Sequence, residues 1–349
     1  MPETWPEYAF FTPLSQNRLM CHTLAPPQSQ YTPGIVLLPY AVIPKAPIRS
    51  VFFKIKSQKA VELQSYKRIC QTQALQPSLS KEDYLKALAN IKKHIQRGDV
   101  YELNFCQKFT ARAELSNPVE CFADLCSQLN MPYAMLLKQA SKYLFCLSPE
   151  LFLKKTKQTL ISKPIKGTAA RHTNLENDAQ AISRLLNSEK ERAEHVMAVD
   201  VARHDLSRVA VRNSVHVPTL FGIETFTNVH QMVSTVKAEL KPDVAWDSLM
   251  EATFPMASMT GAPKLKAIEL IHQYEGFNRD WYSGALGQTE ASGDFELAVV
   301  IRSFYYDAQA RQIEICAGGA ITHYSDPEQE YEECLLKIRK LAGLLGWEV

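Results

Sequence analysis

The sequence lacks the motifs that define several large enzyme classes. It contains no G-x-G-x-x-G or Walker-type phosphate loop, no H-E-x-x-H zinc motif and no G-x-S-x-G nucleophile elbow. These absences argue against a dinucleotide or P-loop site, a zinc peptidase and an α/β-hydrolase. No cysteine stands in a G-x-C-x-G context of the glutaminase type. If this chain catalyses a reaction that uses ammonia, another chain must therefore generate the ammonia.

The chain also lacks a strong excess of charge and a long apolar run. Its 39 Lys and Arg residues nearly balance its 37 Asp and Glu residues, which argues against a dedicated nucleic-acid-binding protein. No apolar run approaches the ~20 residues that span a bilayer, so we expect no membrane partner. The start of the sequence, MPETWPEYAFF, has no basic residue before its apolar stretch and does not read as a secretory signal.

The 8 cysteines are scattered and form no C-x-x-C pair. Several stand in apolar contexts such as LFCLS and IEICAGG, where a free thiol behaves as a small buried hydrophobe. We therefore expect a reduced, cytoplasmic protein rather than a disulfide framework.

Helix and strand signals alternate irregularly, which predicts an α+β fold rather than a doubly wound sheet. Helices are expected over residues 81–98, from 188 to about 201, over 263–276 and from 326 onward, each with a capping residue or a terminal glycine. ELAVVIRSFYYD and QIEICAGGAIT are expected to form a buried antiparallel pair. We expect residues 1–75 to form a β-rich segment packed on a catalytic domain of residues 76–349.

Two of the expected helices each carry a pair of glutamates three residues apart. These are Glu191 with Glu194, and Glu330 with Glu333. Because residues three apart share one helix face, each pair can point at one place. Carboxylates without His or Cys at ligand spacing suit Mg²⁺, whereas the alternative is ordinary solvated helix surface.

Lys166 ends a β-like run in KPIKGT. It is either a surface charge or an inward-facing amine. Burial or a nearby cation would lower the pKa of an inward-facing amine and make it a nucleophile.

Other residues suggest anion binding. The run Ala317-Gly318-Gly319-Ala320 follows a strand, and its N–H groups could hold a carboxylate, although a tight bend in the sheet explains it as well. Arg302 stands in an apolar run, where an unpaired charge is costly, so it should face a protein or ligand carboxylate. Lys264 is either a residue that binds an anion or, equally well, an exposed residue in the first turn of a helix. No metal-ligand spacing relates His195, His204 and His230 to one another, so we interpret them as ordinary core or surface residues.

Taken in order, nine segments resemble the chorismate-binding enzyme family from about residue 80 to the C-terminus. They include SPELF, KPIKGT, SEKERAEHVMAVDVARHDLSRV, TGAPKLKAIELI, YSGALG, VVIRSF, CAGGAIT and EQEYEECLLKIRK. The resemblance implies an anthranilate synthase component I-like fold, with helices around large, mostly antiparallel sheets. It also implies chorismate as the substrate.

The resemblance assigns roles to the residues singled out above. It implies that Glu194 and Glu333 bind Mg²⁺, with Glu191 and Glu330 one turn away either supporting these ligands or serving as alternate ligands. It implies that the ring carboxylate of chorismate lies against Gly318, Gly319 and Lys337. The enolpyruvyl carboxylate would lie against Arg302 and Tyr282.

The segment Pro164–Thr168 separates members of the family. It resembles the PIKGT of aminodeoxychorismate synthases rather than the PIAGT of anthranilate synthases. The resemblance implies that Lys166 adds to C2 of chorismate before ammonia enters at C4, that Glu150 protonates the departing hydroxyl, and that Thr168 helps to bind the substrate.

Two further positions bear on the choice. Isochorismate and salicylate synthases have a water-activating lysine where this chain has Glu102, and anthranilate synthases have a histidine where it has Gln231, with His230 one position early. We expect C4 amination of chorismate with ammonia from a glutamine amidotransferase subunit. Anthranilate synthesis, isochorismate or salicylate synthesis, and an inactive binding subunit are the alternatives. The first 75 residues show no LLES-like motif, so tryptophan binding is not expected.

Overall fold

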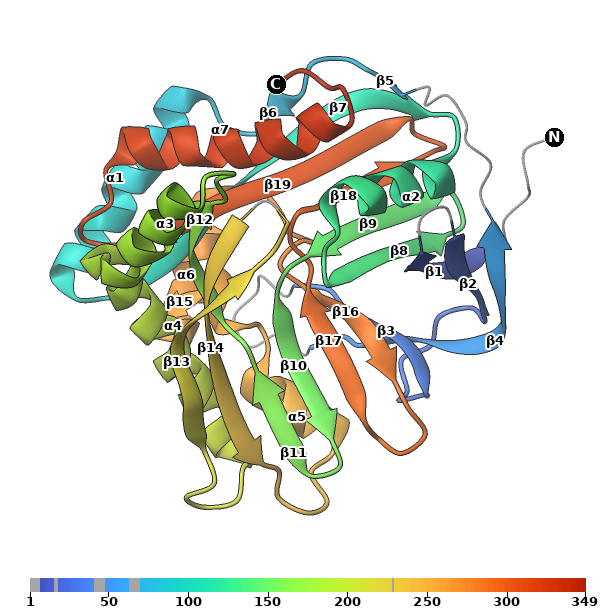
Figure 1. Ribbon diagram of the computed structural model, residues 1–349, viewed down its shortest axis with the longest axis horizontal. Coiled ribbons are helices and arrows are strands. Elements are labelled where there is room, and N and C mark those ends of the chain that lie inside the picture. Colours follow the sequence, from blue (N-terminus) through green and yellow to red (C-terminus); the bar gives the residue numbers. More distant parts are fainter. Residues whose placement is uncertain (1–6, 16–17, 41–47, 63–69, 228) are drawn as a thin grey trace.

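Two antiparallel sheets share one long strand and form the centre of the molecule (Figure 1). The computed structural model describes residues 7–15, 18–40, 48–62, 70–227 and 229–349. Strand β4 (Val51–Glu62) pairs through one part with β2 (Arg18–Leu24) and through another with β3 (Gly34–Leu38), so it belongs to both sheets. The expected α+β fold with large antiparallel sheets is confirmed.

The first sheet continues from β2 in one direction. Its further strands, in spatial order, are β1 (Tyr8–Ser15), β8 (Tyr133–Gln139), β9 (Lys142–Ser148), β18 (Ser303–Asp307), β19 (Gln312–Ile321) and β7 (Glu102–Leu115). The short strands β5 (Cys70–Thr72), β6 (Gln76–Pro77) and β15 (Gly261–Ala262) pair with β7.

The second sheet continues from β3. Its further strands are β16 (Ala285–Thr289), β17 (Phe295–Val299), β10 (Leu151–Thr156), β11 (Thr159–Ser162), β14 (Val229–Glu239) and β13 (His216–Thr225), with β12 (Ile165–Ala170) also on β14.

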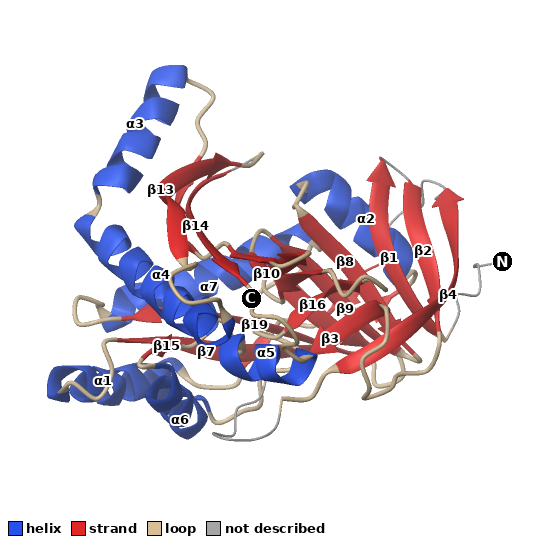
Figure 2. Cartoon of the chain, turned by 90° about the horizontal axis from the view of Figure 1, so that it is seen from below, coloured by secondary structure: helices blue, strands red, loops and turns tan. Residues whose placement is uncertain are grey.

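Helices cover the outer faces of the two sheets (Figure 2). They are α1 (Lys81–Arg97), α2 (Pro118–Leu129), α3 (Leu175–Asn187), α4 (Glu189–Val209), α5 (Trp246–Thr253), α6 (Lys264–Glu275) and α7 (Pro327–Leu344), with a short 3₁₀ turn η1 (Ala257–Met259). The predicted caps are confirmed, since the side chains of Ser80, Ser188 and Asp326 accept hydrogen bonds from the first turns of α1, α4 and α7. The sequence reading did not identify α2 and α3.

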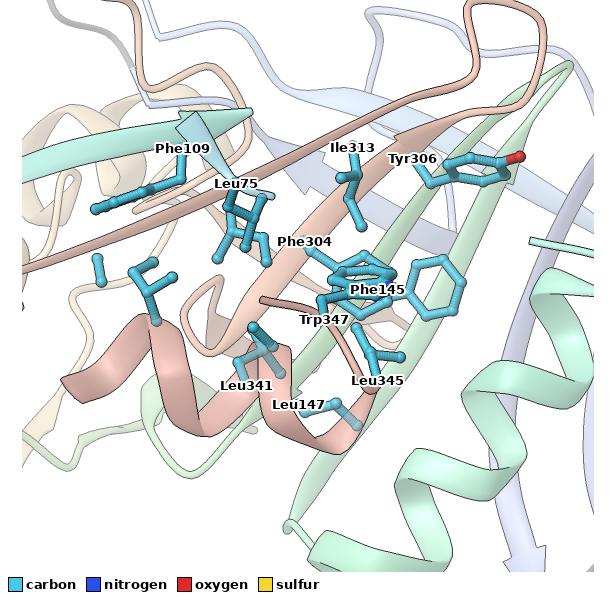
Figure 3. Close-up of a cluster of buried hydrophobic side chains, with 14 of the residues drawn as sticks. Leu75, Phe109, Phe145, Leu147, Phe304, Tyr306, Ile313, Leu341, Leu345 and Trp347 are labelled. Atoms are coloured by element: carbon cyan, nitrogen blue, oxygen red, sulfur yellow. The ribbon is translucent and has the colours of Figure 1, made fainter. Parts of the chain in front are cut away.

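Three apolar clusters hold these layers together. One lies between the sheets, one lies between the first sheet and α1, α2, α6 and α7, and one lies between the second sheet and α4 and α5. In the second of these clusters Phe145 and Phe304 stack at 4.1 Å between ring centroids, and Trp347 packs edge-on against Phe304 (Figure 3). The C-terminal residues thereby fix α7 on the sheet.

The predicted strand pair near the C-terminus is only half right. Strand β18 pairs with β19 as expected, but β17 belongs to the second sheet and pairs with β10 and β16. The chain changes sheets between Val299 and Ser303. The predicted division of the chain near residue 75 stays a prediction.

The side chain of Arg279 is completely buried and ties three segments together. Its guanidinium donates to Glu275, to the carbonyl oxygen of Met259 and to that of Asn104 on β7. Glu275 in turn accepts a hydrogen bond from the backbone N–H of Cys106, also on β7. This pair fixes the end of α6 and the η1 turn against the strand that carries Glu102.

We expect Arg279→Met to lower the free energy of unfolding by about 3–5 kcal/mol, because it leaves Glu275 buried without its partner. Urea denaturation measures the change. The matched control is Arg203→Met, which removes an exposed pair with Asp200 on α4 and should cost less than about 0.5 kcal/mol. Equal decreases in the free energy of unfolding of the two variants would show that the buried pair stabilises the fold no more than an exposed pair does.

Candidate active site

An ion pair between Lys166 and Glu102 connects the two sheets. Lys166 lies on β12 of the second sheet, and Glu102 begins β7 of the first sheet. The Lys166 Nζ lies 2.6 Å from the Glu102 Oε1, and both side chains are almost completely buried. The second oxygen, Glu102 Oε2, is buried without a hydrogen-bond partner.

The alternative of an inward-facing amine for Lys166 is confirmed, but the lowered pKa predicted with it is wrong. Burial alone would lower the pKa of Lys166, but Glu102, Glu194 and Glu150 surround the amine and raise its pKa above the ordinary value. The alternative of a surface charge is also wrong, because the amine points inward. Lys166 is therefore held as a buried ammonium ion.

Glu150 lies in the short connection before β10 and is buried. Burial raises the pKa of Glu150 to about 7, although Lys166 and Arg302 act in the opposite direction. A mostly apolar cavity lies beside this carboxyl; its lining includes Leu151, Phe152, Leu153, Ala202, Leu206 and Met256. A carboxyl group with this pKa can hold a proton at neutral pH and donate it.

The glutamates of α4 point into the site from the first turns of that helix. Glu194 is buried, its Oε1 has no hydrogen-bond partner, and burial raises its pKa to about 7. Glu191 lies next to Gly167, where a Cβ atom would come within 2.9 Å of the Glu191 Oε2. Gly167 has φ +79°, which glycine adopts without strain, so KPIKGT needs glycine here for both reasons.

The glutamates of α7 gather opposite Gly319 on β19. A Cβ atom on Gly319 would lie 3.1 Å from the Glu330 Oε2, and 3.8 Å from both the Glu333 Oε1 and the Lys337 Nζ. Lys337 forms an ion pair with Glu333 at 2.8 Å and donates to the carbonyl oxygen of Gly318. The absence of a side chain at Gly319 therefore leaves a cradle lined by charged groups.

Gly318 has a different reason to be glycine. A Cβ atom there would lie 2.0 Å from the carbonyl oxygen of Phe105, so the residue permits the close approach of β7 and β19. Close packing of β19 against β7 thus accounts for Gly318, and the open cradle accounts for Gly319.

Lys190 is a site residue that the sequence reading missed. Its Nζ lies 3.4 Å from the Glu330 Oε1 and 3.9 Å from the Glu194 Oε1, between α4 and α7. Its position four residues before Glu194 was the only available signal, and it could not reveal the contact with the distant helix α7.

The carboxylates of α4 and α7 fit a hard divalent cation. Within the described ranges, no three Asp, Glu, His or Cys side chains already lie in the arrangement of a metal site. However, the Glu194 Oε1 is buried without a partner, a lysine ammonium lies between two of the four carboxylates, and Gly319 leaves the cradle open. All-oxygen donors of this kind are those that Mg²⁺ prefers.

Arg302 lies in the bend between β17 and β18, not within a strand as expected. Its φ of +47° is in the left-handed region, which is costly for a residue other than glycine and is typical of functional sites. Its Nη1 lies 3.8 Å from the Met131 Sδ, and no salt bridge to its guanidinium occurs in the part of the chain that the structure describes. This leaves a half-buried cation available for a ligand anion.

Tyr282 is half-buried, with its hydroxyl 4.0 Å from the Cys106 Sγ. Burial raises the pKa of Tyr282, so the hydroxyl stays protonated and can donate a hydrogen bond.

Strand β14 presents Gln231, not His230, beside Thr168. The Gln231 Nε2 lies 3.5 Å from the Thr168 Oγ1, and the two residues are opposite each other in the β12–β14 ladder. Neighbouring residues in a strand point to opposite faces. The His230 Nε2 accordingly lies 2.9 Å from the Asp178 Oδ1 on α3, which agrees with reading His230 as a core residue.

Lys264 is not the exposed residue that was considered equally plausible. Its amine is buried, forms an ion pair with Asp205 on α4 and donates to the carbonyl oxygen of Thr253. It therefore fixes α6 to α4. Among the described helices, none has the length and apolar character of a membrane span. The free cysteines are Cys21, Cys106, Cys121, Cys126, Cys146, Cys316 and Cys334.

Two antiparallel sheets bring together a buried lysine, a protonatable glutamate and four helix-borne carboxylates, an arrangement typical of an enzyme active site. The family model described as chorismate binding enzyme matches residues 51–343, so the chain belongs to this family. The solved structure of a 2,3-dihydroxybenzoate-specific isochorismate synthase from Bacillus anthracis has the same fold, with a TM-score of 0.79 at 20% identity, covering 99% of this chain and 97% of that one.

Three curated relatives each match about three quarters of this chain. It is 39% identical to an aminodeoxychorismate synthase of Arabidopsis thaliana, 36% identical to an anthranilate synthase alpha subunit of Oryza sativa and 34% identical to aminodeoxychorismate synthase component 1 of Escherichia coli. In each case the match covers 76% of this chain. The matches span 29%, 48% and 58% of those relatives' own lengths, respectively.

The raised pKa of Glu150 predicts a specific pH dependence of stability. The folded protein binds this proton more tightly than the unfolded chain, whose carboxyl has a pKa near 4.5. The contribution is complete below that value and is lost as the pH rises through about 7.

At pH above 7, Glu150→Gln should therefore increase the free energy of unfolding by an amount on the order of 1–3 kcal/mol and raise the unfolding temperature relative to the parent protein. In mild acid the unfolding temperature should change less. Differential scanning fluorimetry across this pH range measures the effect. A shift that does not vary with pH would contradict the raised pKa.

Proposed function

We propose that the chain aminates chorismate at C4, forming 4-amino-4-deoxychorismate as component I of an aminodeoxychorismate synthase. The observation that carries the proposal is the buried amine of Lys166, which lies among Glu102, Glu194 and Glu150. Two of the relatives described above are named aminodeoxychorismate synthases. The product would serve p-aminobenzoate and folate synthesis.

Charged and polar groups would orient the substrate. Arg302, which has no salt bridge among the described residues, and the neutral hydroxyl of Tyr282 are suited to the enolpyruvyl carboxylate. The cradle at Gly319, with Lys337 and the neighbouring Gly318, is suited to the ring carboxylate, and Thr168 to a substrate hydroxyl. Fixing both carboxylates before reaction removes much of the entropic barrier to attack on the ring.

Mg²⁺ would be held by Glu194 and Glu333, with Glu191 and Glu330 as neighbouring ligands. When bound, it would neutralise the ring carboxylate and help to polarise the ring. The negative charge of the four carboxylates, which the ammonium groups of Lys190 and Lys337 now partly compensate, would then be compensated by a cation of higher charge.

Two displacements would place nitrogen at C4. The amine of Lys166 would add at C2 while the C4 hydroxyl leaves with the proton of Glu150. Ammonia would then enter at C4 and expel the lysine from C2. Direct attack of ammonia at C2 would instead give the 2-amino compound of the anthranilate route.

The ammonia would come from a separate glutamine amidotransferase subunit. The name component 1 of the Escherichia coli relative supports a second component, and the sequence lacks a glutaminase cysteine motif. The proposal includes a cytoplasmic location, in keeping with free cysteines.

Anthranilate synthesis is the second candidate, since one relative of similar identity is an anthranilate synthase subunit. Two observations weigh against it: the presence of Lys166, and the side chain of His230, which is turned toward Asp178 rather than toward Thr168.

Lys166→Ala should abolish formation of the C4-amino product while leaving chorismate binding within a few-fold, because it removes the nucleophile but neither carboxylate clamp. The assay contains chorismate, Mg²⁺ and ammonium at mildly alkaline pH, with and without aminodeoxychorismate lyase, and products are identified by chromatography and mass spectrometry. p-Aminobenzoate should appear only with the lyase.

The matched control is Lys163→Ala, which removes a partly exposed lysine three residues away whose partner is Glu224. It should retain parental activity. Undiminished C4 amination by Lys166→Ala would refute the covalent role, and anthranilate from the parent protein would refute the proposed reaction.

Glu333→Gln should raise the Mg²⁺ concentration needed for half-maximal activity by about tenfold or more, since it removes one charged ligand. Isothermal titration with Mg²⁺ gives a second reading that does not depend on turnover. The control Glu332→Gln changes an exposed neighbour on α7. Identical Mg²⁺ dependence in the two variants would remove Glu333 from the metal site.

A further inference from the structure

Glu102 is a buried carboxylate with only one of its two oxygens used. Its Oε1 binds Lys166 at 2.6 Å, whereas its Oε2 has no hydrogen-bond partner. Buried carboxylate oxygens are normally satisfied, and those that are not call for an explanation. A carboxylate that served only to hold the two sheets together would gain from a second hydrogen bond.

The chemistry of Lys166 requires a proton acceptor. An ammonium ion has no lone pair, so it must lose a proton before its nitrogen can bond to carbon. Three carboxylates face it from three segments: Glu102 from β7, Glu194 from α4 and Glu150 from the connection before β10.

Only one of these carboxylates is placed and free to take the proton. Within the described residues, Glu102 is the only carboxylate within 4.0 Å of the Lys166 Nζ. Glu150 must keep its own proton for the departing hydroxyl, and Glu194 is assigned to the cation. Glu191 and Glu333 also interact electrostatically with Lys166, and His195 is buried on α4, but no ion pair within 4.0 Å joins either glutamate to Lys166 among the described residues.

We propose that Glu102 positions the amine of Lys166 and accepts its proton as the lysine attacks chorismate. This inference rests on the proposed function. One proton moves from the Nζ to the Oε1, and the freed lone pair forms the bond from nitrogen to C2. The electron pair of the ring double bond shifts, the C4–oxygen bond breaks, and Glu150 protonates the hydroxyl to give water.

The second displacement restores the pair. Ammonia bonds to C4, the electrons shift back, and the C2–nitrogen bond breaks to release neutral Lys166. Glu102 then returns its proton to the amine, so the pair ends as it began. The ammonium group formed at C4 gives its extra proton to the Glu150 carboxylate, which restores the acid for the next turnover. Because the proton stays within the pair, attack does not depend on loss of a proton to solvent.

The test compares three carboxylate variants of the full chain. Glu102→Gln removes the acceptor but keeps the size of the side chain, Glu102→Asp keeps a carboxylate, and Glu224→Gln is the control at the exposed Lys163 pair. Formation of the lysine adduct is followed by rapid quench, with chorismate and Mg²⁺ but no ammonium, as a function of pH.

For Glu102→Gln we expect the rate of adduct formation to fall by at least about tenfold near neutral pH and to rise with pH, because the proton must now go to solvent. The parent protein and Glu224→Gln should show no such rise, and Glu102→Asp should restore part of the flat profile. A role limited to holding the fold would lower the rate equally at every pH.

A second reading uses no substrate. Reductive methylation of Lys166, quantified by peptide mass spectrometry, should begin at a pH about one unit or more lower in Glu102→Gln, since the partner charge is lost. If the parent protein is active and Glu102→Gln keeps the parental pH dependence of both adduct formation and Lys166 methylation, this inference is overturned but the proposed function is not. A parent protein that forms no C4-amino product overturns the proposed function, and this inference with it.

Discussion

The ion pair between Lys166 and Glu102 is the interaction on which the rest of the site depends. It joins the first residue of β7 in one sheet to β12 in the other, in a region where both side chains are buried. Two buried charges are tolerable only if their positions are fixed, because loss of either partner leaves the other uncompensated. The Arg279–Glu275 pair fixes β7 on one side, and the β12–β14 ladder fixes Lys166 on the other.

The carboxyl groups around this pair are buried at a cost to the stability of the fold. Glu150 and Glu194 both have pKa values raised to about 7 by burial, and the Glu194 Oε1 has no hydrogen-bond partner. Such groups lower the stability of the fold at neutral pH. Binding of the proposed divalent cation and dicarboxylate substrate would relieve much of this cost.

Much of the local structure could be predicted from sequence, and the long-range electrostatics could not. The caps at Ser80, Ser188 and Asp326 determine where helices begin, and they depend on residues within one turn. The run through Arg302 was read as one strand because β-forming residues do not reveal that the chain changes sheets there. The pKa of Lys166 was predicted in the wrong direction because its three carboxylates come from distant segments. The resemblance to a known family brought these residues together as one site, which spacing alone could not do.

The central claim is that Lys166 attacks chorismate, and one measurement tests it most directly. The protein is incubated with chorismate and Mg²⁺ without ammonium, quenched in acid, digested and analysed by mass spectrometry. The account predicts that the peptide containing Lys166 gains the mass of chorismate less one water, and that added ammonium removes this species as the C4-amino product forms. Formation of the C4-amino product with no adduct on Lys166 at any time would contradict the account.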